Sequence, residues 1–191
     1  MSAPVFVGNG IYTISSFLTP EECQALIAHT EALGYDEAPV TTRRGPVMMK
    51  EVRNNTRVMV DDVPEAQRLW KRLAPMYPKG FPWPQAPIGL NERLRFYRYA
   101  PGQRFKPHRD GSYRRPNGEW SQVTFMVYLN GGFEGGATRF LDGDGCTVVP
   151  EEGKALLFAH MLMHEGAAVT SGCKYVLRSD VMYPAMTYGE G

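Results

Sequence analysis

The second half of this chain is a succession of short segments rich in β-branched and aromatic residues. After Pro87 these segments read LRFYRYA, VTFMVYLN, ATRFL, CTVVP, KALLFAH and KYVLRSDVMY. Glycine-containing turns such as Gly131-Gly132 separate them. Residues of these types favour strands, and many short strands at close spacing are typical of a sandwich or barrel. The sequence therefore predicts a mainly β core.

Alternation within two of these segments assigns their faces, because successive side chains of a strand point to opposite sides of a sheet. In 123–130 the odd-numbered positions are all apolar. In 174–183, Leu177 lies on one face, whereas Lys174 and Arg178 share the other. We therefore expect a β layer with an apolar face against helices and a polar face that lines a wet pocket.

The first third of the chain contains signals for helices. A helix is predicted to start near Thr19, which can cap it, with Pro20 in its first turn and Glu22 completing a capping box. A second helix is expected to open at Pro64 and to end before Pro75. These two helices are the expected support for the β layer.

Length and composition limit the class of protein. The 191 residues suffice for one domain with a hydrophobic core. A formal net charge of +1 gives no reason to expect a nucleic-acid partner, since duplex-binding proteins are usually more basic. The apolar runs are too short to span a membrane, and the N-terminus lacks the pattern of a signal peptide. The three cysteines form no CxxC motif, which is typical of reduced thiols in a cytoplasmic protein.

One triplet and two later histidines suggest a metal site. His108 and Asp110 are separated by one position, so in an extended chain they point to the same side and can bind one metal. Such a triplet also arises by chance. Of the four histidines in the chain, His29 falls in the first predicted helix, which leaves His160 and His164 as candidates for a distal ligand. Two imidazoles and one carboxylate leave positions open on an iron, as in non-haem iron(II) oxygenases.

The order of the motifs is more specific than any one of them. The stretch from about Leu90 to Tyr183 resembles the catalytic domain of the prolyl 4-hydroxylase-like branch of the iron(II)/2-oxoglutarate dioxygenases. The matching pieces are RFYRYAPGQRFKPHRDG, VTFMVYLN, GGFEGGATRF, VVPEEGKALLF and MHEGAAVTSGCKYVLRSDVMY, and FLTPEECQALI resembles the helix that precedes them. The resemblance implies a double-stranded β-helix, or jelly-roll, core. We expect a single domain, 1–191, with N-terminal helical support and a flap region in 1–89 and the dioxygenase core in 90–185.

The resemblance also implies roles for individual residues. The implied iron ligands, which are also the catalytic residues, are His108, Asp110 and His164, and the implied co-substrate residues are Lys174, Tyr99, Tyr128, Thr124 and Arg178. His164 is preferred to His160 because Lys174 and the following strand are in register with it. Lys174 matches a basic residue that binds the C5 carboxylate of 2-oxoglutarate, an anion that is costly to bury unpaired. Tyr128 matches a second donor to that carboxylate. For Arg178 three interpretations stay open: a second contact to the anion, a contact to the substrate, or a solvated residue of the strand.

The implied activity is hydroxylation of an unactivated C–H bond with Fe(II), 2-oxoglutarate and O₂, and ascorbate as a reductant. A prolyl or other side chain of a peptide or protein is the expected substrate. A free small molecule, such as an amino acid, is the alternative. A nucleic-acid demethylase is disfavoured, because a second arginine expected after the distal histidine is missing. The alternative of another class is a non-catalytic β-sandwich binding module.

The stretch 40–57 lies outside the densest resemblance and is basic. Its charged residues are Arg43, Arg44, Lys50, Arg53 and Arg57 against Glu51. It also contains Gly45-Pro46 beside two methionines, which favours a loop or hairpin with adaptable apolar side chains. We expect it to form a mobile flap that lies over the iron site and helps to choose the substrate; the alternative is a solvated surface loop.

Overall fold

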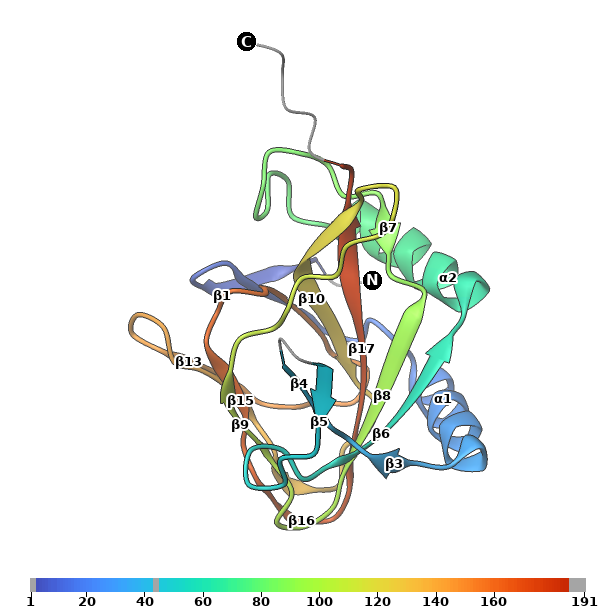
Figure 1. Cartoon of the computed structure of the whole chain (residues 1–191), viewed down its shortest axis with the longest axis vertical. Helices are drawn as coiled ribbons and strands as arrows, with labels where there is room; N and C mark the ends of the chain where they lie inside the picture. The colour runs from blue at the N-terminus through green and yellow to red at the C-terminus, as the bar shows by residue number, and fades with distance from the viewer. Residues whose placement is uncertain (1–2, 43–44, 186–191) are drawn as a thin grey trace.

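One large antiparallel sheet forms most of the computed structural model, which describes residues 3–42 and 45–185 and, for 41–42, the backbone alone. Nine strands make up this sheet within the described residues, in the order β1-β2-β14-β10-β17-β8-β6-β3, with β7 also paired to β17 (Figure 1). Their bounds are β1 (Val5–Gly8), β2 (Ile11–Ile14), β3 (Asp36–Glu37), β6 (Thr56–Asp61), β7 (Gly89–Leu90), β8 (Arg93–Tyr99), β10 (Trp120–Tyr128), β14 (Ala155–Ala159) and β17 (Lys174–Tyr183).

A smaller sheet has four strands in the order β13-β12-β15-β9. These strands are β9 (Phe105–His108), β12 (Thr138–Phe140), β13 (Cys146–Val148) and β15 (His164–Gly166). Two separate strand pairs join β11 (Glu134–Gly135) to β16 (Val169–Ser171) and β4 (Val40–Thr42) to β5 (Gly45–Val47). The two main sheets and the antiparallel pairing confirm the predicted mainly β, jelly-roll class.

The two α-helices lie on one side of the large sheet, whereas β9 and β15 lie on the other (Figure 1). The helical elements are α1 (Pro20–Leu33), α2 (Val63–Leu73) and the short 3₁₀ helix η1 (Ala74–Met76). Thr19 caps α1, and the Thr19–Glu22 capping box is present as predicted. Asp62 caps α2, which therefore opens one residue before Pro64.

The faces of β10 divide the core into two clusters. Its odd-numbered apolar residues, including Phe125, pack with Leu69 of α2 in the cluster on the helix side. Its Tyr128 belongs to a second cluster with Tyr97 of β8 and Phe140 of β12, between the two sheets. The alternation read from the sequence therefore matches the observed faces, and the inner face is the one that borders the candidate site.

The first third of the chain supplies strands as well as helices. β1 and β2 form a hairpin that extends the edge of the large sheet beyond β14. Its turn contains Asn9-Gly10, a dipeptide that favours tight hairpins. At the other edge β6 pairs with β8. The N-terminal region is thus part of the sheet and not only a helical support behind it.

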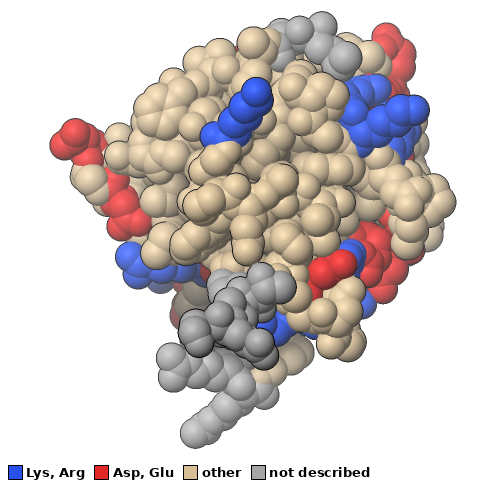
Figure 2. All heavy atoms as spheres, turned by 90° about the horizontal axis from the view of Figure 1, so that it is seen from above, with Lys and Arg blue, Asp and Glu red and all other residues tan. Residues whose placement is uncertain are grey.

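The predicted loop or hairpin in 40–57 contains the β4–β5 pair. Arg43 and Arg44, which belong to the same stretch, lie outside the described residues. No helix within the described ranges combines the length and apolar character that crossing a membrane requires. Figure 2 shows one face of the molecule, on which basic and acidic residues are scattered among uncharged ones.

Glu22 connects the two helices and generates a stability prediction. Its carboxylate accepts hydrogen bonds from Arg72 and Arg68 of α2 and from the backbone of Thr19. The bond from Arg72 contributes most to lowering the pKa of Glu22 from 4.5 to about 2. A lowered folded-state pKa stabilises the fold above the unfolded-state pKa, and this contribution is lost as the pH falls through the folded-state value.

We therefore expect Glu22→Ala to lower the free energy of unfolding by about 1–2 kcal/mol at pH 7, since it removes a cap and a partly buried ion pair. The difference from the wild type should shrink as the pH falls from 4.5 toward 2. Urea unfolding across this pH range measures it. Glu51→Ala is the control, because Glu51 is exposed and makes no ion pair with the described residues. A difference that stays constant with pH would contradict the assigned role.

Candidate metal centre

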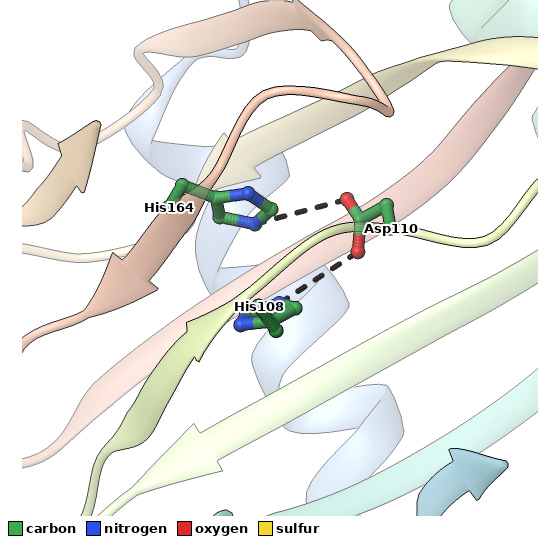
Figure 3. Close-up of side chains that lie close together, drawn as sticks. All are labelled: His108, Asp110 and His164. Carbon is green, nitrogen blue, oxygen red and sulfur yellow. Dashed lines mark ion pairs between the residues drawn. The ribbon is translucent and has the colours of Figure 1, made fainter. Parts of the chain in front are cut away.

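Strand pairing brings two histidines and one aspartate together. His108 ends β9 and His164 begins β15, and the antiparallel register of these strands places the two residues opposite each other. Asp110 follows β9 and points back between them (Figure 3). The Nε2 atoms of His108 and His164 lie 3.7 and 3.8 Å from the two carboxylate oxygens of Asp110. Ligand atoms from all three residues lie within 4.8 Å of one another.

Backbone carbonyls orient both imidazoles. Nδ1 of His108 lies 2.8 Å from the Lys106 carbonyl, and Nδ1 of His164 lies 3.0 Å from the Leu162 carbonyl. Because a carbonyl only accepts, each Nδ1 carries the proton, and each Nε2 lone pair is free for a metal. Burial lowers the pKa of His108 to about 4, with a further contribution from His164. Burial also lowers the pKa of His164. Both rings are therefore neutral near pH 7, as metal binding requires.

Asp110 is held as a carboxylate. Burial would raise its pKa, but Arg178 and the two histidines hold the pKa well below its usual range. Nη1 of Arg178 lies 3.0 Å from Oδ1 of Asp110. The Thr124 hydroxyl donates to Oδ2 at 2.5 Å. Two neutral imidazoles and one ionised carboxylate on one side of a small space form a donor set that suits a divalent transition metal and leaves other positions open.

His160 lies outside this cluster but is connected to it. Thr124 donates its only hydroxyl proton to Asp110, so it accepts a hydrogen bond from Nδ1 of His160 at 2.9 Å. Nε2 of His160 then accepts from the Ser121 hydroxyl at 3.0 Å. Burial lowers the pKa of His160 to about 4. His160 therefore supports the orientation of the Asp110 carboxylate through Thr124.

Lys174 lies in the same cavity as the cluster and is buried without a carboxylate. Within the described residues its ammonium group donates to the Gly136 carbonyl at 2.5 Å, and no ion pair is formed. Burial lowers the pKa of Lys174 to about 7. Gly136 has a φ of 65°, and a Cβ there would lie 3.0 Å from Cδ of Lys174. The glycine thus allows the close approach that fixes the lysine.

The remaining predicted co-substrate residues surround this lysine or the metal cluster. The rings of Tyr99 and Tyr128 lie 5.2 and 5.3 Å from Nζ of Lys174. Tyr99 lines the cavity, as do Thr124 and Arg178. Tyr128 does not line the cavity, whereas Thr138 does. The hydroxyl of Tyr128 lies 2.7 Å from the hydroxyl of Thr138. Arg178 contacts Asp110 and Asp180, so it lies at the metal end of the cavity.

Sequence reasoning did not identify several residues of the site. Arg95 and Tyr97 lie at every second position of β8 together with Tyr99, a predicted site residue. Side chains at such positions point to the same face of a sheet, so this spacing could have identified both residues. Arg53 belongs to the stretch 40–57 that the sequence predicts as a flap, but it is not among the predicted site residues; an isolated bridge to Phe105 brings it to the site. Nothing local in the sequence indicates this contact, because it depends on how a distant segment folds over β9.

Comparisons with known proteins agree with this geometry. Residues 94–179 match the sequence model of the 2OG-Fe(II) oxygenase superfamily. Prolyl 4-hydroxylase 1 of Arabidopsis thaliana is 30% identical over 193 aligned positions, which cover 86% of this chain and 66% of that protein. The chain thus spans just under two thirds of this relative.

Solved structures share the fold. A viral collagen prolyl hydroxylase from Paramecium Bursaria Chlorella virus-1, solved as a 2OG complex, has a TM-score of 0.64 at 20% identity, covering 92% of this chain and 97% of that one. A Trichoplax adhaerens prolyl hydroxylase, solved with a peptide fragment of the hypoxia inducible factor oxygen degradation domain, has a TM-score of 0.69 at 16% identity, covering 92% and 84%.

The Thr124 hydroxyl generates a prediction about the metal centre. Thr124→Val removes the donor to Asp110 and leaves Nδ1 of His160 without its acceptor. Outer partners of metal ligands typically contribute about 10- to 100-fold to affinity. We expect a loss of Mn(II) affinity in this range, measured by isothermal titration calorimetry. Thr124→Ser restores the hydroxyl and should restore the affinity. Equal affinities of the valine variant and the wild type would contradict the assigned role.

Proposed function

We propose that this chain is a member of the 2OG-Fe(II) oxygenase superfamily, because residues 94–179 match its sequence model. In this proposal it is an Fe(II)- and 2-oxoglutarate-dependent dioxygenase that hydroxylates a prolyl or other side chain of a peptide or protein. The observation that carries the proposal is a metal-ligand cluster that shares one cavity with the buried Lys174, which has no counter-charge in the described parts of the chain. A non-catalytic binding module has no need of this combination.

In this proposal His108, Asp110 and His164 hold the iron through two Nε2 atoms and a carboxylate oxygen. When bound, Fe(II) with 2-oxoglutarate supplies the activation of dioxygen needed to oxidise a C–H bond. The protein keeps both imidazoles neutral by burial and keeps the carboxylate ionised through Arg178. Phe105 and Phe158 line the cavity beside the cluster and give this part of its wall an apolar surface.

Lys174 is proposed to bind the C5 carboxylate of 2-oxoglutarate. A buried ammonium group without a carboxylate is unfavourable, and an incoming anion restores its charge balance. The hydroxyl of Thr138 lines the same cavity, and Tyr128 supports that hydroxyl from behind. Tyr99 forms the wall beside the ammonium group. The proposed role of Tyr128 is therefore to orient Thr138.

The prolyl substrate is supported by the relatives, since the Arabidopsis protein is named a prolyl 4-hydroxylase. We further propose that residues 1–191 act as one domain, because β1, β2, β3 and β6 are strands of the same sheet as β8, β10, β14 and β17. A cytoplasmic location is proposed from the three free cysteines, of which Cys23 is buried.

The test is formation of succinate from 2-oxoglutarate with Fe(II) and ascorbate, followed by a search for peptide products that gain one oxygen atom. The wild type should produce succinate, and His164→Ala should abolish both this activity and iron retention. His29→Ala is the matched control, because His29 lies exposed on α1 and far from the cluster in the fold. Full activity of His164→Ala would refute the proposed iron site.

Lys174 generates a second prediction. Lys174→Met retains the length of the side chain but removes the partner of a buried carboxylate, a loss of about 2–5 kcal/mol. We expect the KM for 2-oxoglutarate to rise by about 30-fold to several thousand-fold, while Mn(II) binding in the absence of 2-oxoglutarate persists. Lys71→Met, on the exposed surface of α2, is the control. An unchanged KM would move the role to another residue.

A further inference from the structure

A second cavity adjoins the metal cluster. It has a volume of about 450 Å³. Its wall shares Tyr97, Phe105, His108, Asp110 and Arg178 with the cavity that contains Lys174. Lys174 itself lines only the first cavity. A molecule in the second cavity would therefore lie against the metal cluster without displacing a molecule held by Lys174, which is the position that a substrate needs.

Arginines dominate the wall of this second cavity. They are Arg53, Arg57, Arg95, Arg109 and Arg178, and we call the cavity they line the arginine pocket. Asp110 is the one acidic residue among the lining residues that the structure describes. Asp110 pairs with Arg178 and is also a proposed metal ligand, so its charge does not neutralise the other four guanidinium groups.

Two of these arginines lack a carboxylate partner. Arg95 and Arg178 share the buried Asp180, at 2.9 and 3.2 Å. Arg109 lies 3.6 Å from Asp142. Arg53 and Arg57 form no ion pair with any residue in the described parts of the chain. The pocket therefore carries an excess of positive charge that the protein itself does not compensate.

Arg53 is the more informative of the two. It is 5% exposed, and its buried Nη2 atom has no hydrogen-bond partner among the residues that the structure describes. Its guanidinium lies between the rings of Tyr97 and Phe105, at 4.4 and 4.5 Å from their centroids, and Nε donates to Asn55. An unpaired buried guanidinium N–H is costly, which indicates a site built to receive an acceptor.

The electrostatic effect of the cluster is visible at Tyr97. Burial raises the pKa of this phenol, yet Arg53, Arg178 and Arg95 together bring the pKa below its ordinary value. The arginines therefore stabilise negative charge at the pocket wall. Carboxylates suit such a wall, because guanidinium groups bind them with paired, charge-assisted hydrogen bonds.

We infer that the arginine pocket binds a carboxylate of the substrate, so that the side chain to be hydroxylated is presented next to an acidic group. This inference rests on the proposed function. The carboxylate has two possible sources: an acidic side chain neighbouring the target residue in a peptide, or the α-carboxylate of a free amino acid or C-terminal residue. Both supply the same chemistry to Arg53 and Arg57.

The test measures binding without turnover. Protein loaded with Mn(II) and 2-oxoglutarate is titrated with proline-containing peptides, blocked at both ends, whose residues beside proline are either Glu or Gln. N-acetylproline and N-acetylprolinamide form a second pair. At least one carboxylate probe should bind about 10-fold or more tightly than its neutral partner, and the preference should decrease as salt rises. A preference for the Glu peptide over the Gln peptide would identify an acidic side chain as the source of the carboxylate. A preference for N-acetylproline over N-acetylprolinamide would identify an α-carboxylate.

Variants assign the preference to the pocket. Arg57→Gln should reduce it several-fold, and Arg57→Lys, which keeps the charge, should retain most of it. Arg104→Gln removes the same charge from an exposed residue outside the pocket and should leave the preference intact. Arg53→Gln tests the buried group, with the melting temperature as a check on folding. Because Arg57 is half-buried, its variants keep the test valid if Arg53→Gln fails to fold.

The outcomes separate this inference from the proposed function. If the protein forms succinate but binds neutral and acidic probes equally, or binds none of the carboxylate probes, the inference is overturned and the dioxygenase proposal stands. If the protein neither binds Mn(II) nor consumes 2-oxoglutarate, the proposed function fails. A preference that Arg57→Gln does not alter also overturns the assignment to this pocket.

Discussion

The pairing of β9 with β15 is the constraint on which the site depends. These short strands belong to the smaller sheet, and their register sets His164 opposite His108. Since side chains alternate along a strand, a shift of one residue would turn one imidazole away from the other. The Nδ1 bonds to backbone carbonyls then fix each ring. Asp110 can thus approach both Nε2 atoms because backbone hydrogen bonds, which are insensitive to the metal, have already set the geometry.

A second constraint is the cost of the charges buried on the inner face of β17. Lys174, Arg178 and Asp180 share this face, because their positions differ by even numbers. Arg178 and Asp180 compensate each other in part, whereas Lys174 has only a carbonyl as its acceptor. A protein selected for stability alone would place apolar residues there. The fold tolerates these charges because the opposite face of the same strand packs Leu177 and Val181 into the helix-side core.

Local rules account for the part of this structure that the sequence predicted. Alternation assigned the faces of β10 and β17, and the capping box placed the start of α1, because each depends on neighbouring residues alone. The position of Arg53 depends instead on a bridge to Phe105 from a distant segment. The β1–β2 hairpin had a local signal at its turn, but its place at the edge of the large sheet is set by pairing with β14. Long-range contacts of this kind decided what was missed.

The spacing of the positive groups along β17 fits the two proposed anion sites. Four residues of extended chain, from Lys174 to Arg178, span about 13 Å. Because Coulomb energy falls with distance, each positive group interacts most strongly with the anion nearest to it. Lys174 lines only the first cavity, Arg178 lines both, and Arg53 and Arg57 line only the second. The metal cluster lies at the boundary between the two cavities, where His108 and Asp110 belong to both walls. In the proposed function, a dicarboxylate co-substrate would occupy the first cavity and an anionic substrate the second, with His108 and Asp110 on the wall that the two cavities share.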